Sequence, residues 1–339
     1  MTGTVHTRLQ SAERDAAWPI TIDDVREARD RLRPYLTPTP LRSYPVLDRE
    51  AGGRMQLLVK HENHQPTNAF KVRNALSFMT ALTGEQRSRG VIAATRGNHG
   101  LGIAYAGSLL GCRVVICVPH GNNPEKNEGM RAFGAELVEV GRDFDEALQH
   151  CLRMATERGL TLAHSTNDRT VIAGAATITL EMVEQDPTLD ALIIGVGGGS
   201  QAVGALTVAR AIRPQMRVFA VQAVGASAGH DGWVAGRPIT LERADTFADG
   251  LATRSCYEMT FPTLRAGLED WVLVSEAQIA DAIRLLLRAT HNLSEGAGAA
   301  PLAAALTLVD RLEGKRVGVI LSGGNIDRET LRRVVNGEL

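Results

Sequence analysis

The sequence predicts an α/β protein of two domains, each built on a mostly parallel, twisted sheet flanked by helices. Its 339 residues exceed what one hydrophobic core of ordinary size accommodates. With 44% hydrophobic and 22% charged residues, the chain can bury a substantial core. Short apolar runs alternate with stretches of helical period along most of the chain, which favours parallel sheets covered on both faces.

The first series of alternating elements lies between residues 86 and 164. Gly111 is a suitable C-cap for one helix, and Pro124 opens another where proline is tolerated. We expect strands at 91–94, 113–118 and 136–140, and helices at 101–110, 124–133 and 143–158.

The alternation resumes after residue 164. The segment 223–267 has no clear period, so we expect loops and short helices there. Helices are predicted at 171–184, 201–212, 276–291 and 296–312, and strands at 191–196, 217–221, 271–274 and 316–321. We therefore assign a small domain to 86–164, a large domain to 19–85 and 165–339, and a flexible N-terminal tail to 1–18.

The composition favours a cytoplasmic protein that binds a small molecule. A net charge of −1 gives no reason to expect nucleic acid or a membrane surface as partner. The four cysteines form no CxxC pair, which fits a reducing cytosol and argues against a disulfide framework or a structural zinc. Residues 1–18 lack the apolar segment of a signal peptide, and no apolar run reaches membrane-spanning length.

Lys71 is the first candidate for chemistry. A nucleophilic lysine must lose its proton, which an apolar, partly dry setting favours. Phe70 and Val72 provide apolar neighbours, but Arg73 and other charged residues lie close in the sequence. The alternative is a solvated lysine at the start of a helix.

A glycine-rich turn follows the predicted strand at 191–196 and precedes a helix. Consecutive backbone N–H groups at a helix N-terminus form a phosphate site, and glycines let the backbone come close to the ligand. The alternative is a plain tight turn. A dinucleotide site is disfavoured because the segment lacks GxGxxG and an acidic ribose partner. The turn consists of Gly197, Gly198, Gly199 and Ser200.

A second turn lies between the strand at 91–94 and the next helix. Its N–H groups and side chains can receive a carboxylate, and Asn98 can bond a phenolic oxygen, although a simple helix cap is the alternative. The candidate substrate-binding residues here are Thr95, Arg96, Gly97 and His99.

Ser322 follows the last strand, at the sheet edge where ligands of open parallel sheets bind. Its hydroxyl can bond a ring nitrogen, or it can cap a helix near Asp327. Glu295 can face the same cleft or serve as a helix-start carboxylate. One lysine, two turns and a strand-end serine in this order indicate pyridoxal 5'-phosphate (PLP) held as a lysine Schiff base.

At these residues the chain resembles the serine/threonine dehydratase family of PLP enzymes, which has the tryptophan-synthase-β-like fold. The resemblance runs from about Ile22 to Val335, and the family's Ser-Phe-Lys-x-Arg motif reads Ala69 to Arg73 here. It implies that the large domain binds PLP and that the enzyme is a homodimer. The implied roles are a catalytic Schiff-base lysine for Lys71, a ring neighbour for Phe70, a phenolic-oxygen partner for Asn98, a phosphate loop for 197–200 and a ring-nitrogen partner for Ser322.

The chain departs from the family at three places. Arg96 replaces a serine that is the second acid/base of racemising relatives, so racemisation is not expected. The segment 222–228 lacks the carboxylates that bind metal in some relatives, so we expect no metal. Cys256 lies in a segment that follows the family's Asp-Gly, where relatives often have Pro-Gly.

The resemblance implies β-elimination from a β-hydroxy α-amino acid such as threonine or serine, giving a 2-oxo acid and ammonia. The variant motifs around Lys71 and Arg96 are similar to those of the ectoine/hydroxyectoine-utilisation dehydratases. A PLP synthase that performs β-replacement is another alternative. Outside PLP chemistry, the alternatives are a nucleotide-binding oxidoreductase and a binding protein that use the glycine turn.

Overall fold

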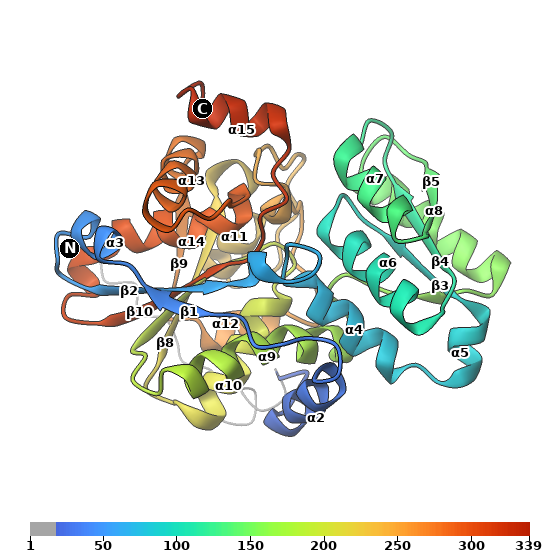
Figure 1. Ribbon diagram of the computed structural model, residues 1–339, viewed down its shortest axis with the longest axis horizontal. Coiled ribbons are helices and arrows are strands. Elements are labelled where there is room, and N and C mark those ends of the chain that lie inside the picture. The colour runs from blue at the N-terminus through green and yellow to red at the C-terminus, as the bar shows by residue number, and fades with distance from the viewer. Residues whose placement is uncertain (1–17) are drawn as a thin grey trace.

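The computed structural model describes residues 18–339 (Figure 1). Of the flexible tail predicted at 1–18, residues 1–17 lie outside the described residues. Trp18 is half-buried against the core, and the guanidinium of Arg210 lies 5.0 Å from its ring centroid. The described chain therefore packs from one residue before the predicted start of the large domain.

The larger sheet has six strands in the order β1-β2-β10-β7-β8-β9. β1 pairs with β2 in the antiparallel sense, and the other neighbours are parallel. The last strand of the chain thus inserts between the second and the seventh. The strands are β1 (Leu41–Ser43), β2 (Gln56–His61), β7 (Ala191–Gly195), β8 (Arg217–Ala223), β9 (Asp270–Val274) and β10 (Arg316–Leu321).

The smaller sheet is parallel throughout and has the order β5-β4-β3-β6. All its strands come from residues 91–162, inside the predicted small domain, although the division into domains stays a prediction. Its strands are β3 (Val91–Ala94), β4 (Val114–Val118), β5 (Glu136–Glu139) and β6 (Thr161–Leu162).

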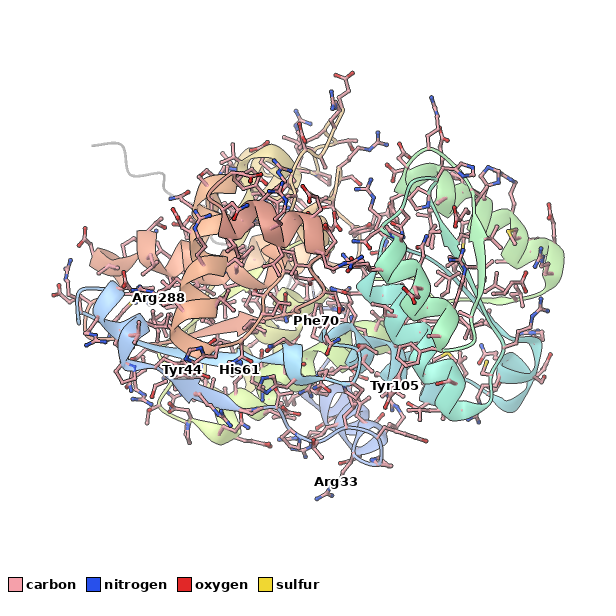
Figure 2. The ribbon with its side chains drawn as sticks, turned by 45° about the horizontal axis from the view of Figure 1, so that its top comes forward. Arg33, Tyr44, His61, Phe70, Tyr105 and Arg288 are labelled. Atoms are coloured by element: carbon pink, nitrogen blue, oxygen red, sulfur yellow. The ribbon has the colours of Figure 1, made fainter. Side chains whose placement is uncertain are left out.

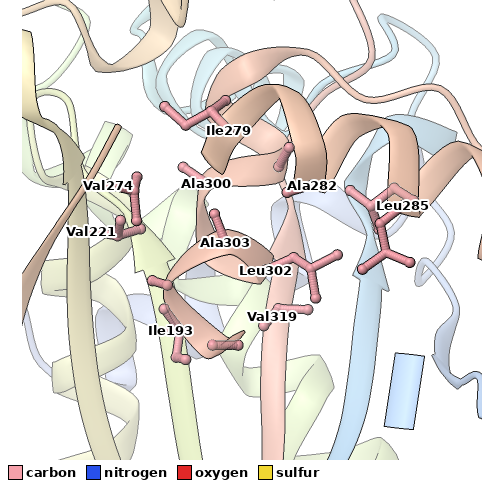
Figure 3. Close-up of a cluster of buried hydrophobic side chains, with 14 of the residues drawn as sticks. Ile193, Val221, Val274, Ile279, Ala282, Leu285, Ala300, Leu302, Ala303 and Val319 are labelled. Carbon is pink, nitrogen blue, oxygen red and sulfur yellow. The ribbon is translucent and has the colours of Figure 1, made fainter. Parts of the chain in front are cut away.

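Helices cover both faces of the larger sheet because its strands are apolar on both sides. In β7, Ala191 and Ile193 point into one core, whereas Leu192 and Ile194 point into the other. The first core is closed by α13 (Glu276–Thr290) and α14 (Gly296–Thr307), as Figure 3 shows. The second is closed by α2 (Ile22–Leu32), α9 (Arg169–Gln185), α10 (Ser200–Ile212) and α12 (Phe261–Gly267).

Helix α4 (Lys71–Ala81) joins the two parts of the molecule, since it packs against α9 on one side and α6 (Asn98–Leu110) on the other (Figure 1). Around the smaller sheet lie α6, α7 (Pro124–Ala132) and α8 (Phe144–Arg158). The shorter helices are α3 (Pro45–Glu50), α5 (Gly84–Arg89), α11 (Ala228–Ala235) and α15 (Arg328–Val335).

The predicted α/β fold is confirmed, and one predicted helix is wrong in length. We expected a helix over 296–312, but α14 ends at Thr307 and a 3-10 turn, Val309–Arg311, follows. There Leu308 and Arg311 bond to carbonyls three residues back, which tightens the chain out of the α-helix. Within residues 18–339, no helix is both long and apolar enough to cross a membrane.

Candidate active site

A cavity lies between the two sheets, beyond the carboxyl ends of β3, β7 and β10. This is where open parallel sheets bind ligands. Figure 2 shows Phe70, one of the lining residues, where the two parts of the molecule meet. All predicted site residues line this cavity: Phe70, Lys71, Thr95, Arg96, Gly97, Asn98, His99, Gly197, Gly198, Gly199, Ser200 and Ser322.

Lys71 is the first residue of α4 and is half-buried in the cavity wall. Its Nζ donates to the Ser165 carbonyl oxygen at 3.1 Å and lies 5.1 Å from the Phe70 ring centroid. Burial lowers the pKa of Lys71 to about 8, because the charged form loses solvation. The alternative of a fully solvated lysine at a helix start is therefore wrong.

The charged residues near Lys71 in sequence belong to a buried network of ion pairs that does not line the cavity. Arg73 forms a bidentate pair with Glu62, at 2.8 and 2.9 Å, and contacts Glu181 at 2.6 and 2.8 Å. Lys60 Nζ donates to Glu181 at 2.7 Å. All four side chains are buried, so this network ties β2, α4 and α9 together without solvating Lys71.

The glycine turn connects β7 to α10 and is closely packed against neighbouring segments. A Cβ on Gly197 would lie 2.3 Å from the Gly250 carbonyl oxygen, and one on Gly198 would lie 2.1 Å from Thr166 Oγ1. Gly199 has φ +95°, which L side chains rarely adopt. The first N–H groups of α10 lack intrahelical partners, so they are available to an anion in the cavity.

Gly197→Ala is expected to weaken PLP binding at least about tenfold, because the new methyl group must displace the backbone that holds the turn. Equilibrium dialysis with PLP measures the change. Gly84→Ala is the matched control, since a Cβ there meets nothing within 4 Å. Equal PLP affinities for the two variants would contradict a ligand-binding role for the turn.

Some polar groups of the turn at 95–99 form hydrogen bonds within the protein. Thr95 Oγ1 accepts from the N–H groups of Gly97 at 2.9 Å and Gly100 at 3.3 Å, so it caps the start of α6. His99 is buried and its Nε2 donates to the Ala163 carbonyl oxygen at 3.0 Å. Burial lowers the pKa of His99 to about 3, and its Nδ1 has no partner among residues 18–339.

Arg96 is exposed at the mouth of the cavity and also lines two adjoining clefts. Its guanidinium forms no hydrogen bond or ion pair within the described part of the chain. The Arg96 guanidinium is therefore not paired with a carboxylate of the described chain, and it is accessible to a ligand that extends from the cavity.

Ser322 is buried at the end of β10, and its carbonyl oxygen accepts from the Phe70 N–H at 2.9 Å. The alternative of a helix cap at Ser322 is wrong, because Asp327 caps α15 through a 2.8 Å bond from Thr330 N–H. Glu295 occupies the N-cap position of α14, yet its side chain turns into the cavity and accepts from Asn98 at 2.6 Å.

Several residues of the cavity were not predicted from the sequence. Lys126 is buried and its Nζ lies 3.0 Å from Asp249 Oδ2. Burial opposes its charge, but Glu295 and Asp249 raise the pKa of Lys126 above its usual value. The available signal for Lys126 was the stretch Pro124 to Asn127, which also resembles the serine/threonine dehydratase family. The other unpredicted lining residues include Ser165, Thr166, Gln201, Thr253 and Tyr257.

The segment 222–228, where some relatives have metal-binding carboxylates, has none in this chain. Gln222 Oε1 accepts from the His230 N–H at 3.0 Å. Across residues 18–339, no group of three or more His, Cys, Asp or Glu side chains is placed to hold a metal ion. Cys256 is half-buried and does not line the cavity.

Comparisons with known proteins agree with this geometry. Residues 32–323 match the family model described as pyridoxal-phosphate dependent enzyme. The chain is 36% identical to L-threonine ammonia-lyase of Thermotoga maritima, over 94% of this chain and 78% of that one. It is 39% identical to L-threonine ammonia-lyase of Geobacter sulfurreducens, over 92% and 77%. The structure of maize serine racemase superposes with a TM-score of 0.89 at 32% identity, covering 95% of this chain and 98% of that one.

The cavity also fits PLP on structural grounds. Its lining includes a lysine with a lowered pKa, and also a turn whose glycine positions exclude a Cβ and whose N–H groups suit a phosphate. The matched region covers most of the chain. The protein therefore belongs to the family of pyridoxal-phosphate dependent enzymes.

Proposed function

We propose that this enzyme converts a β-hydroxy α-amino acid, threonine or serine, into a 2-oxo acid and ammonia. The main support is the environment of Lys71: the residue is half-buried, its pKa is lowered to about 8, and the cavity that it lines is also lined by the glycine turn. Two relatives named L-threonine ammonia-lyase support the reaction class. In this proposal PLP is held by Lys71, Phe70, Asn98, Ser322 and the 197–200 turn.

Bound PLP supplies a carbonyl for the substrate amine and an electron-withdrawing ring that acidifies the Cα proton. The Lys71 amine first holds the cofactor and, once released, accepts the Cα proton. The hydroxyl on Cβ takes up a proton, which the Lys71 ammonium can return, and leaves as water. The resulting amino-alkene then takes up water to give the 2-oxo acid and ammonia. A neutral Ser322 at the ring nitrogen leaves that nitrogen unprotonated and disfavours transamination.

Product analysis tests the proposal. The purified protein should contain PLP and should release equal amounts of ammonia and 2-oxo acid from threonine or serine, without an added nucleophile. Turnover that requires an added nucleophile would instead favour a β-replacement synthase. A colourless protein that takes up no PLP but binds NAD would favour the nucleotide-binding alternative.

The rate at which cofactor-free protein takes up PLP is expected to rise about tenfold per pH unit below pH 8 and to level off above it. Only the neutral amine reacts with the cofactor's aldehyde, and burial lowers the pKa of Lys71 to about 8, so the neutral form becomes dominant there. Stopped-flow absorbance measures this rate. A rise that continues unchanged to pH 10 would indicate an unperturbed lysine.

Arg96 favours a second candidate, in which the substrate carries an additional anionic or polar group. Arg96→Ala is expected to lower kcat/KM roughly 10- to 100-fold for a substrate whose carboxylate it binds. For 3-hydroxyaspartate the loss should exceed that for serine or threonine if Arg96 recognises the second carboxylate. Negligible losses for all three substrates would remove Arg96 from substrate recognition.

Racemisation, named for the maize neighbour, is not part of this proposal, because Arg96 stands where racemising relatives carry the serine that acts as the second acid/base. A cytoplasmic homodimer that needs no metal stays a prediction. The ectoine/hydroxyectoine branch also stays a prediction, which the Arg96 kinetics bear on directly.

A further inference from the structure

We propose that Glu295 and Asn325 are positioning residues that fix the side-chain amide of Asn98, so that Asn98 presents a hydrogen-bond donor to the cavity. The inference rests on the proposed function, since the group that would receive this donor is the phenolic oxygen of PLP. Neither Glu295 nor Asn325 received a role in the predicted cofactor site. The argument follows from a chain of hydrogen bonds that begins at a backbone carbonyl.

The orientation of Asn325 is set by Thr67. Asn325 Nδ2 lies 2.9 Å from the Thr67 carbonyl oxygen and 2.8 Å from Asn98 Oδ1. A backbone carbonyl can only accept, so Asn325 must direct its NH₂ group to Thr67. The same NH₂ group supplies its second hydrogen to Asn98, and the Asn98 atom that faces it must therefore be the oxygen.

Glu295 fixes the other end of the same amide. Its Oε1 lies 2.6 Å from Asn98 Nδ2, and the carboxyl group accepts this bond whether or not it carries a proton on its other oxygen. Glu295 is only 7% exposed and makes no cap bond to α14. Turning the Asn98 amide over would place oxygen against Glu295 and two donors against each other at Asn325, at a cost in both bonds.

One hydrogen of Asn98 Nδ2 remains after these bonds are made. It has no partner within the described residues, and Asn98 lines the cavity. A donor stabilises the anionic form of a phenolic oxygen, whereas an acceptor would destabilise it. Asn98 begins α6, which lies beside the smaller sheet. Glu295 directly precedes α14 and Asn325 follows β10, and both elements belong to the larger part. The direction of the Asn98 donor is therefore fixed by the packing of the two parts against each other.

The double variant Glu295→Gln/Asn325→Asp tests this inference at constant net charge. The introduced aspartate can only accept from Asn98, and the introduced glutamine can donate to it, so the amide should turn over and direct its oxygen into the cavity. The Kd for PLP should rise at least about tenfold. The absorption of the bound cofactor should move toward that of the form protonated on its phenolic oxygen, with an apparent pKa at least about one unit higher.

Two variants serve as controls. Glu295→Gln alone should keep the wild-type absorption, because the glutamine oxygen can still accept from Asn98 while Asn325 is unchanged. Asn63→Asp makes the same amide-to-carboxylate exchange outside the cavity, where Asn63 Nδ2 donates to Asn292 Oδ1 at 3.1 Å and to the Leu293 carbonyl at 3.4 Å. It should leave both the absorption and the PLP affinity unchanged.

A double variant that matches Glu295→Gln in absorption and in PLP affinity would overturn this inference alone. A wild-type protein that does not attach PLP to Lys71 would overturn the proposed function and this inference with it. If the double variant does not fold, Asn325→Asp alone decides the matter. It should shift both readouts in the same direction by a smaller amount, and wild-type values for it would overturn the inference.

Discussion

Replacing Lys71 by alanine is expected to abolish covalent PLP attachment and to lower turnover by several orders of magnitude. The substitution removes the amine that holds the cofactor and the base that takes the Cα proton, so two contributions are lost together. Borohydride reduction of the wild-type protein, followed by peptide mapping, should place the reduced cofactor on Lys71. Assays of ammonia release from threonine measure the loss of activity.

Lys126 provides the control, because it is the other lysine that lines the cavity. Its ammonium is held by Asp249 at 3.0 Å, and the neighbouring carboxylates raise the pKa of Lys126, which makes it a poor nucleophile. Lys126→Gln should therefore keep the borohydride label on Lys71, even if turnover falls. Label on Lys126, or an active Lys71→Ala enzyme, would refute the proposed role of Lys71.

The cavity was predictable from the sequence where a candidate site residue directly follows an apolar strand. The glycine turn after β7, the turn after β3 and Ser322 after β10 each have this position. β7 and β10 are neighbours in the larger sheet, and parallel strands bring their carboxyl ends to one edge, so the glycine turn and Ser322 meet without any knowledge of long-range contacts. The turn after β3 belongs to the smaller sheet, and it reaches the same cavity through the packing of the two parts of the molecule. Most strands and helices from residue 91 onward were predicted to within a few residues because they are long enough to display a period, but β6 was not predicted and α14 is shorter than predicted.

Contacts between distant segments were not predictable in this way. The Lys126–Asp249 pair and the Asn98–Glu295 bond join residues 123 and 197 positions apart, and no local pattern encodes either. No strand or helix was predicted before residue 85. β1 and α3 have too few residues to display a period, whereas α2 and α4, with 11 residues each, are long enough to display one. The charged residues around Lys71 appeared unfavourable because Glu181, which pairs with both Arg73 and Lys60, lies far along the chain.

Arg73→Met is expected to lower the free energy of unfolding by about 3–5 kcal/mol, because it leaves two buried carboxylates with only Lys60 to compensate them. The loss is a large fraction of the stability of an ordinary protein. Urea denaturation measures it. Arg332→Met is the matched control: Arg332 also contacts two carboxylates, Glu329 and Glu338, but does so in solvent, and its loss should change stability little.

The pH dependence separates a lost ion pair from lost packing. Burial favours the neutral form of Glu62, but the guanidinium of Arg73 outweighs it and lowers the Glu62 pKa below its usual value. In the wild type this contribution to stability is present above the unfolded-state pKa, about 4.3, and is lost as pH falls through the lower folded value. In Arg73→Met, burial acts unopposed by that guanidinium and raises the Glu62 pKa, so protonation removes the unpaired charge as pH falls. The stability difference between the two proteins should therefore shrink from pH 7 toward pH 4, whereas a deficit independent of pH would mean that Arg73 acts through packing alone.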